Sequence, residues 1–450
     1  MRLRFTSLAL LFACGSGAHG TATVDTPPAT TSALVSASVQ TDVPDAPPVC
    51  GSLDKEKYAL PAYDTSKWDA PLPPIVDEEN AMAPFYERVA ELVRGKATDH
   101  VRIGVYGDSN MTMDYITGAL RRMLQAKFGD AGHGYVALAM PWPWYRHQDV
   151  HHELTDKWRE IASSTNGISD AQYGFANIAA ESAEPGNWAR VATADEKAPI
   201  GTKVEKIDIY FMKRPSGGDF TIKIDGKADH DVSTAADDIE AGFEHLDLAD
   251  GPHKIECVVK GNGKVRLFGA SMERGTPSIT VDSLGTGALN YEQMARVKDQ
   301  TRVPQIAHRK YDLVVFLLGT NLFAPAYHER WMTSVFESFH KAIPNLPLLV
   351  LSPPDIELHS TDTESDPRIV KLSLQLKGIA GRHHAAFWDF RAAMGGNMSM
   401  IRFAKMGLAQ WDLVHLKATG GANMGERFGH ALFKGFDAYL SKHPDAGCAQ

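Results

Sequence analysis

The 450-residue sequence has no long basic run, no apolar stretch that approaches the length of a membrane span, and no internal repeat. Acidic residues outnumber basic ones by 55 to 46, and the formal net charge of −9 disfavours nucleic-acid binding. A bilayer span needs about 20 consecutive apolar residues, so no membrane-spanning helix is predicted. The chain has 44% hydrophobic and 22% charged residues, a globular balance, and is long enough for two domains with appendages.

The first 14 residues have the pattern of a signal peptide. Arg2 and Arg4 precede a short apolar run, and small residues follow it. The cysteine after Ala13 resembles a bacterial lipoprotein box, which implies cleavage before Cys14 and acylation of its thiol. The protein is therefore expected to be lipid-anchored in the bacterial cell envelope, in the periplasm or on the cell surface. Ordinary secretion stays open as an alternative, because Phe12 is uncommon in that box.

Cysteine is scarce, with four in the whole chain. Residues 15–50 are rich in Thr, Ala, Ser and Pro and are expected to form a disordered linker that ends at Cys50. If Cys14 carries the lipid, a disulfide between Cys50 and Cys448 is the economical pairing in an exported protein. Two unrelated thiols stay open as the alternative. Cys257 alternates with apolar residues in a strand-like run.

Two separated parts of the sequence, 51–150 and 279–450, show the pattern of one layered domain. Apolar runs without alternation are typical of parallel strands that are covered on both faces. Helical spacing of apolar residues separates these runs, as in the segment 331–339 and in the last helix, 424–440. The pattern predicts a three-layer α/β/α domain with a parallel sheet. The runs are Leu313–Leu318, Leu348–Leu351 and Ala385–Trp388, and Val101, Ile103 and Val105 supply an earlier strand.

The stretch 151–278 has a different pattern. Apolar residues alternate with polar ones in short runs, such as Ile207–Phe211 and Phe220–Ile224. Tight turns such as Asp225-Gly226 follow these runs. Period-two strands with glycine turns predict an antiparallel β-sandwich, inserted into the α/β domain.

A serine stands where the first apolar strand ends. Gly107 and Asp108 supply a turn, Ser109 follows, and apolar residues at helical spacing come next. Ser109 is therefore expected at the start of the helix, where free N–H groups and the helix dipole favour developing negative charge. The simpler alternative is that Ser109 only caps the helix.

Three further groups of residues could serve a serine nucleophile. Gly319-Thr320-Asn321 places an amide at the carboxyl end of a strand, where α/β sheets bind ligands. The segment 281–287 is another strand end followed by glycines, which allow close approach of a backbone N–H. Asp412 stands three residues before His415, so its carboxylate could orient the imidazole while the other ring nitrogen takes the serine proton.

These blocks, in their order along the chain (107–109, 285–287, 319–321 and 412–415), resemble those of the SGNH hydrolases, also called GDSL-type esterases and lipases. Within that family the chain is similar to cell-envelope carbohydrate and peptidoglycan O-acetylesterases with an inserted β-sandwich. The resemblance implies that Ser109 is the nucleophile, His415 the general base and Asp412 its orienting carboxylate. It also implies an oxyanion hole formed by the Ser109 and Gly287 N–H groups and the Asn321 side chain.

Three details of the blocks bear on that resemblance. Gly285 is a near-even alternative to Gly287 as the oxyanion donor. Leu322 stands where many members have a carboxylate, and Asn110 stands where leucine or histidine is commoner. The Gly-x-Ser-x-Gly elbow of the α/β-hydrolases is absent, which disfavours that rival fold.

The function expected from the resemblance is hydrolysis of O-acyl esters on an envelope or extracellular polysaccharide through an acyl-serine. O-acetyl is the expected acyl group. The substrate is thus an acylated polysaccharide or a small ester, and membrane contact is expected only through the lipid anchor. An O-acyltransferase and a non-catalytic glycan-binding lipoprotein stay open as alternatives. No cofactor or metal is predicted, because no histidine group has ligand spacing. The aromatics Trp142, Trp144 and Tyr145 could stack on a sugar or could pack as a loop.

Overall fold

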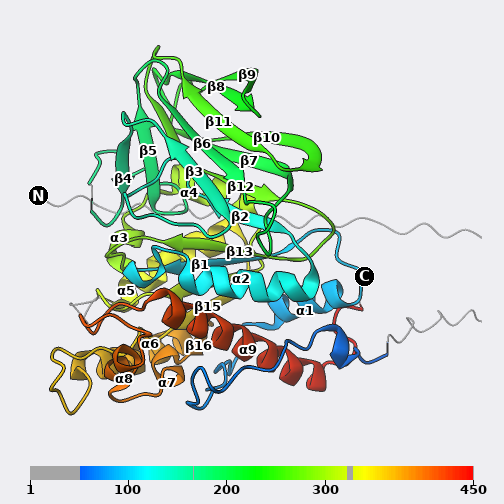
Figure 1. The fold of residues 1–450 in the computed structure, drawn as a ribbon, viewed down its shortest axis with the longest axis vertical. Helices are drawn as coiled ribbons and strands as arrows, with labels where there is room; N and C mark the ends of the chain where they lie inside the picture. The colour runs from blue at the N-terminus through cyan, green and yellow to red at the C-terminus, as the bar shows by residue number, and fades with distance from the viewer. Residues whose placement is uncertain (1–50, 166, 322–327, 449–450) are drawn as a thin grey trace, which may run out of the picture. The chain divides into compact units, whose positions relative to one another are not determined.

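The computed structural model describes residues 51–165, 167–321 and 328–448. Its centre is a sheet of five parallel strands in the order β13-β1-β14-β15-β16 (Figure 1). The register pairs Gly107 with both Gly285 and Leu317, so three neighbouring strands end at the same level. The strands are β1 (Val101–Gly107), β13 (Ile279–Gly285), β14 (Leu313–Leu317), β15 (Leu348–Leu351) and β16 (Ala386–Trp388).

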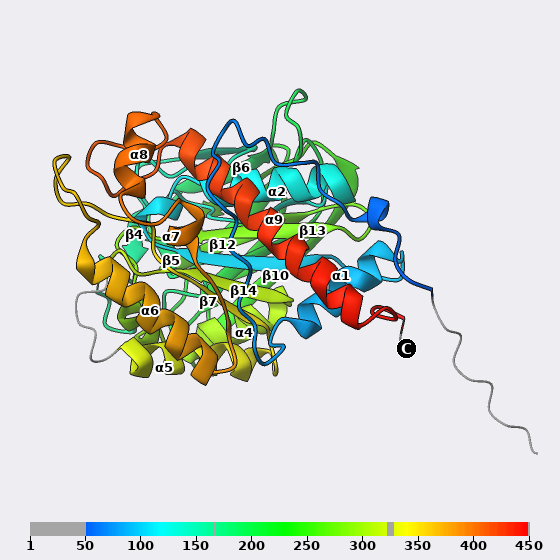
Figure 2. The same cartoon turned by 90° about the horizontal axis from the view of Figure 1, so that it is seen from below.

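Helices cover both faces of this sheet. Alternate strand residues point to opposite faces, so Val315 belongs to one apolar core and Phe316 to the other. The first face carries α1 (Ala83–Val93), α2 (Tyr115–Phe128), α7 (Phe390–Ala393), α8 (Ser399–Lys405) and α9 (Ala418–Lys442). The second carries α3 (Tyr291–Ala295), α4 (Asp299–Arg309), α5 (His328–Ala342) and α6 (Pro367–Arg382). Figure 2 shows α9 lying across the first face.

The three-layer α/β/α prediction is confirmed. All residues of β14, β15 and β16 are buried, which explains why these strands are continuous apolar runs in the sequence. The predicted helices at 331–339 and 424–440 lie within α5 and α9.

The inserted segment forms two antiparallel sheets that pack against each other, as expected of a β-sandwich. Ile209, Phe220 and Cys257 lie in the apolar core between the sheets. Asp225 and Gly226 both have positive φ, as a two-residue hairpin turn requires, and they join β8 to β9. One sheet contains β10 (Glu240–Gly251), β7 (Val204–Lys213), β12 (Val265–Glu273), β5 (Ile178–Ser182) and β4 (Arg159–Ala162). The other contains β3 (Val150–Leu154), β6 (Trp188–Thr193), β11 (Lys254–Val259), β8 (Asp219–Ile224) and β9 (Lys227–Ser233).

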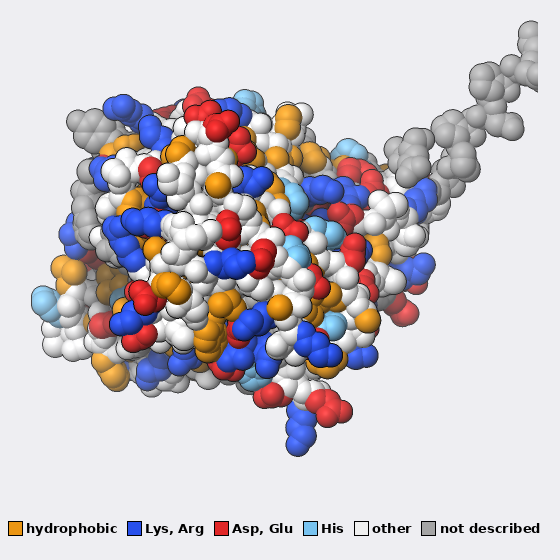
Figure 3. All heavy atoms as spheres, turned by 90° about the horizontal axis from the view of Figure 1, so that it is seen from above, with side chains coloured by type: hydrophobic (Ala, Val, Ile, Leu, Met, Phe, Trp, Pro, Cys, Tyr) orange, Lys and Arg blue, Asp and Glu red, His pale blue; other side chains and the backbone are white. Residues whose placement is uncertain are grey.

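One strand of the sandwich precedes residue 151. The short strand β2 (Gly132–Val136) pairs antiparallel with β12, so the chain enters the sandwich soon after α2. Seen from the sandwich side, the surface mixes acidic and basic side chains (Figure 3).

A buried charge network ties the sandwich to the central sheet. Arg309 of α4 binds Asp282 of β13 with N–O distances of 2.7 and 2.8 Å, and it also pairs with Glu273 of β12. Arg102 of β1 binds Glu273 at 2.7 Å. Breaking such a buried network leaves an uncompensated charge, so it holds the sandwich in a fixed position on the sheet.

Candidate active site

Ser109 lies in a tight turn rather than at the start of the long helix. It begins a three-residue 3₁₀ turn, η2 (Ser109–Met111), and α2 starts only at Tyr115. Asp114 interrupts the helix because it has a left-handed backbone, with φ of 57°, and its carboxylate pairs with the buried Arg121. The expectation that Ser109 sits at the amino end of that helix is therefore wrong, and the long helix's dipole does not begin at the serine.

Asp108 fixes the shape of the serine turn. Its carboxylate accepts a hydrogen bond from the Asn110 N–H at 3.1 Å, so Asp108 is the capping residue and Ser109 is not. Thr112 donates to the Ser109 carbonyl oxygen at 2.9 Å. Burial raises the pKa of Asp108 above its ordinary value, and the Asn110 hydrogen bond only partly offsets this.

The loop before α9 places His415 and Asp412 side by side. Asp412 Oδ2 lies 2.8 Å from His415 Nδ1, and Asp412 Oδ1 accepts the His415 backbone N–H at 3.0 Å. Leu413 has a positive φ of 58°, which closes the loop. Partial burial raises the pKa of Asp412, but the hydrogen bonds from His415 and Val414 outweigh it and hold this pKa below its ordinary value. The carboxylate is thus kept ionised beside the imidazole.

The same imidazole reaches the serine. His415 Nε2 lies 2.9 Å from Ser109 Oγ, although the two residues are 306 positions apart in sequence. With Nδ1 protonated, the ring donates to Asp412, and Nε2 accepts the hydroxyl proton of Ser109. A hydroxyl, an imidazole and a carboxylate thus lie within hydrogen-bond distance in one row, an arrangement that can activate a serine hydroxyl.

Asn321 stands at the end of the neighbouring strand with a free amide. Its Nδ2 atom is buried and has no hydrogen-bond partner among the described residues, while the backbone carbonyl oxygen of Asn321 accepts from Asn290 Nδ2 at 3.3 Å. A buried donor without a partner is costly, typically by about 1–3 kcal/mol. An oxyanion that forms near Ser109 would satisfy it.

The two glycines proposed for the oxyanion hole occupy different surroundings. A Cβ on Gly285 would lie 2.4 Å from Met111 Cβ, so this glycine is required for close packing of β13 against the serine turn. A Cβ on Gly287 would meet nothing closer than Thr112 Cγ2, at 4.0 Å. A side chain at Gly287 would therefore meet open space, whereas one at Gly285 would clash with the serine turn.

Several other sequence expectations have clear outcomes. Trp142 and Tyr145 are buried, and their rings pack edge to face with centroids 5.6 Å apart, so they form a packed loop. Of these three aromatics, Trp144 alone is exposed. Cys448 is disulfide-bonded and Cys257 is a buried free thiol. Cys14, Cys50 and Leu322 lie outside the described residues.

Within the described parts of the chain, no group of three or more His, Cys, Asp or Glu side chains is arranged to hold a metal ion. No described helix is both long and apolar enough to cross a membrane.

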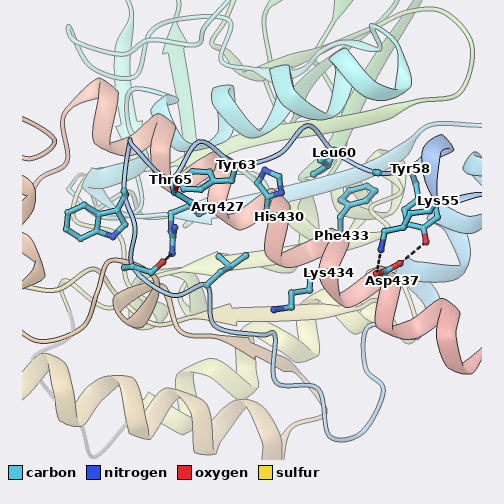
Figure 4. A pocket seen from close by; sticks show the side chains of 14 residues that line it. Lys55, Tyr58, Leu60, Tyr63, Thr65, Arg427, His430, Phe433, Lys434 and Asp437 are labelled. Carbon is cyan, nitrogen blue, oxygen red and sulfur yellow. Dashed lines mark hydrogen bonds and ion pairs between the residues drawn. The ribbon is translucent and has the colours of Figure 1, made fainter.

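A cavity of about 520 Å³ adjoins the site, and Asn321 and Val414 are among its lining residues. A second cavity, of about 450 Å³, lies between the segment 55–72 and α9 (Figure 4). In that second cavity Lys55 and Tyr58 both bind Asp437, and Arg427 donates to the backbone of the same segment. These polar groups are used to dock the segment on α9, so we assign the second cavity no function.

No family model matches the chain, and no curated protein matches it. Among solved structures, one described as a peptidoglycan O-acetylesterase "in action" matches with a TM-score of 0.67 and 22% identity, over 81% of this chain and 99% of that chain. A family two carbohydrate esterase from Clostridium thermocellum matches with a TM-score of 0.27 and 10% identity, over 62% and 98%. A salicylyl-acyltransferase gives 0.29 and 12%, over 64% and 95%. The last two scores are too low to carry an argument. The first shows that the chain shares its fold with that structure, in agreement with the predicted α/β/α domain with an inserted β-sandwich.

Proposed function

We propose that the protein is a serine esterase of the SGNH type that removes O-acyl groups from a polysaccharide. O-acetyl is the acyl group that we expect it to remove. The observation that carries the proposal is the row Ser109 Oγ, His415 and Asp412, with distances of 2.9 and 2.8 Å. Few structural roles require a serine hydroxyl, an imidazole and a carboxylate in this order, whereas nucleophilic catalysis does.

The proposed reaction has two halves. Ser109 Oγ attacks the ester carbonyl while His415 Nε2 takes its proton, and the resulting oxyanion accepts hydrogen bonds from the Ser109 and Gly287 N–H groups and from Asn321 Nδ2. The intermediate then expels the sugar oxygen, which receives the proton from His415, and an acyl-serine is left. Water, deprotonated by His415, attacks the acyl-serine and releases the carboxylic acid.

A glycan substrate is supported by an exposed aromatic ring next to the site. Trp411 is 61% exposed and directly precedes Asp412. A flat apolar ring is a suitable surface for the apolar face of a sugar. The matching fold also belongs to a structure described as a peptidoglycan O-acetylesterase. Binding energy from a contact between this ring and a sugar, away from the reacting ester, raises the rate only if the contact orients the ester at Ser109.

The first experiment compares the wild type with Ser109→Ala on p-nitrophenyl acetate and with a fluorophosphonate probe. We expect ester hydrolysis and covalent labelling of the wild type, and neither for the variant. Equal behaviour of the two proteins would refute the esterase. A folded wild type that is not labelled would favour a glycan-binding module instead.

The second experiment identifies the substrate and the acceptor. Acetate release is measured from acetylated peptidoglycan, from acetylated xylan and from p-nitrophenyl esters of rising chain length. We expect release from at least one glycan, and preference for long chains with no glycan activity would point to a lipase. Trp411→Ala should raise KM for the glycan but not for p-nitrophenyl acetate, and Leu374→Ala, at an exposed apolar position of α6, is the control. Transfer of acetyl to an added glycan, without free acetate, would identify an acyltransferase.

We further propose that the protein is exported and anchored by a lipid on Cys14, with residues 15–50 as the tether. The support is the sequence pattern around Cys14, since this segment lies outside the described residues. Mass spectrometry of the mature amino terminus tests it. A lipid-modified Cys14 is the expected result, and an uncleaved Met1 or a cleaved but unmodified amino terminus would contradict it.

A further inference from the structure

Asn110, the residue after the serine, connects the serine turn to the histidine loop. Its side-chain Nδ2 donates to the Val414 carbonyl oxygen at 3.2 Å. Its Oδ1 accepts the Leu416 N–H at 2.9 Å. The two partners flank His415 on both sides, so one amide group holds the backbone on either side of the imidazole.

The amide is well placed to transmit the position of one element to the other. Asn110 is only 7% exposed, and its own N–H is held by the buried Asp108 carboxylate at 3.1 Å. A short hydrogen-bonded path therefore runs from the end of β1 through Asp108 and Asn110 to the backbone around His415. Water competes little with hydrogen bonds at such a site, so they constrain the geometry more than exposed ones do.

The histidine loop needs this support, because its side chains are open to solvent. The His415 side chain is 38% exposed and the Asp412 side chain 45% exposed. The loop is closed on its own side by hydrogen bonds such as Gln410 N to His415 O at 2.8 Å, but these do not set its distance from Ser109.

We infer that Asn110 is a positioning residue that sets the distance between His415 Nε2 and Ser109 Oγ through paired hydrogen bonds to Val414 and Leu416. This inference rests on the proposed serine-esterase function. Leucine cannot replace Asn110 in this role, because it offers neither a donor nor an acceptor. A displacement of about 1 Å at a catalytic group can lower the rate by roughly 10²-fold.

The test uses Asn110→Leu in the full-length protein, with Asn423→Leu as a matched control. Asn423 is also buried and also uses both ends of its amide, accepting from Tyr63 and donating to the Lys67 carbonyl oxygen, but it faces the amino-terminal segment. We expect Asn110→Leu to lower kcat on p-nitrophenyl acetate by roughly 10–10²-fold with KM nearly unchanged. The rate of fluorophosphonate labelling should fall by a similar factor. Asn423→Leu should lower the unfolding midpoint without lowering kcat.

A second variant keeps the test decisive if Asn110→Leu does not fold. Asn110→Asp has nearly the same shape and keeps the acceptor for Leu416 N–H, but it replaces the donor to Val414 with a carboxylate oxygen. The carboxylates that already face His415 are Asp412 on its own loop and Asp108 on the serine turn. A third one favours the protonated imidazole, which cannot take the serine proton, so the acid limb of kcat/KM should move to higher pH.

The inference is overturned if a folded Asn110→Leu keeps kcat and labelling within about twofold of the wild type, or if Asn110→Asp has the wild-type rate and pH profile. A loss of stability with unchanged kcat per labelled site would also overturn it, because Asn110 would then act on folding alone. Failure of the esterase proposal would give a different result, namely a wild type without Ser109-dependent hydrolysis or labelling.

Discussion

The Asp412 carboxylate contacts His415 twice: Oδ2 lies 2.8 Å from the ring Nδ1, and Oδ1 accepts the His415 backbone N–H at 3.0 Å. One carboxylate thus fixes both the ring and the loop that carries it. Asp412→Asn keeps the size but can present an N–H to His415 Nδ1, which favours the wrong tautomer. We expect kcat to fall by about 10²–10⁴-fold, in line with such substitutions in serine proteases. Steady-state kinetics measures this, and a kcat within a fewfold of the wild type would exclude Asp412 as the orienting group.

Asn321 provides a second prediction, because its amide donor is buried and unused among the described residues. Asn321→Ala removes a proposed oxyanion donor and should lower kcat by about 10²–10³-fold with little change in KM. Asn321→Asp has the same size but presents an acceptor to the oxyanion, so it should lose at least as much. If both variants retain wild-type kcat at a normal unfolding midpoint, the oxyanion hole is formed without Asn321.

The sequence predicted the sheet well because its strands are buried on both faces. Runs such as Leu313–Leu317 and Leu348–Leu351 have no other common explanation once helices separate them. The blocks around Ser109, Asn321 and His415 were also visible, since each follows a strand or precedes a helix. What could not be read was their separation in space, which depends on the register that ends β1, β13 and β14 at one level.

Local sequence patterns gave wrong predictions where tertiary contacts determine the backbone conformation. The apolar spacing after Ser109 predicted one continuous helix, but Asp114 has a left-handed backbone, and its carboxylate pairs with the buried Arg121. Strand β2 was missed since Gly132 and Gly134 weaken any strand pattern, and it forms only by pairing with β12. Asn110 was noticed as an unusual residue, but its partners lie about 300 positions away, at Val414 and Leu416.

Gly285, which ends β13, and Gly287, which follows it, should respond differently to alanine. Gly285→Ala places a Cβ 2.5 Å from the Met111 backbone carbonyl, and such overpacking typically costs about 1–3 kcal/mol. We expect a lower unfolding midpoint together with lost activity. Gly287→Ala has 4.0 Å of clearance and keeps its N–H, so it should fold normally and retain hydrolysis to within about tenfold. Thermal unfolding and p-nitrophenyl acetate assays compare them. If Gly287→Ala were the less stable and less active of the two variants, the prediction would be wrong.

A pair of carboxyl groups after β15 predicts a pH dependence of stability. Glu357 is 1% exposed, and burial together with a hydrogen bond to Asp355 raises its pKa from 4.5 to about 8. The folded protein therefore binds a proton between these values that the unfolded chain releases. The stabilisation is complete below about pH 4.5 and is lost as pH rises through 8.

Glu357→Gln tests this dependence, since an amide stays neutral and can still donate to Asp355. The variant should match the wild type in unfolding midpoint at acid pH and exceed it above pH 8. The exposed neighbour Glu364 supplies the control, and Glu364→Gln should follow the wild type at every pH. Parallel pH curves for the wild type and Glu357→Gln would show that Glu357 is ionised in the fold.

The last prediction concerns the two ends of the folded chain. Cys448 is disulfide-bonded, and Arg94 holds the carbonyl oxygens of Gly51 and Ala446 at 3.0 and 2.7 Å. Gly51 directly follows Cys50, so one guanidinium keeps the residues next to both cysteines together. We therefore expect Cys50 to be the partner of Cys448, with Cys257 left as a thiol.

Non-reducing peptide mapping should recover a peptide pair that contains Cys50 and Cys448. Because the bond closes a loop that spans the whole folded region, Cys448→Ser should lower the free energy of unfolding by about 2–4 kcal/mol. Reducing agent should destabilise the wild type similarly and leave Cys448→Ser unchanged. Cys257→Ala is the control, since it removes a core thiol but should keep the sensitivity to reducing agent. A mapped pair that includes Cys257 would contradict the assignment, because that thiol is buried between the two sheets of the sandwich.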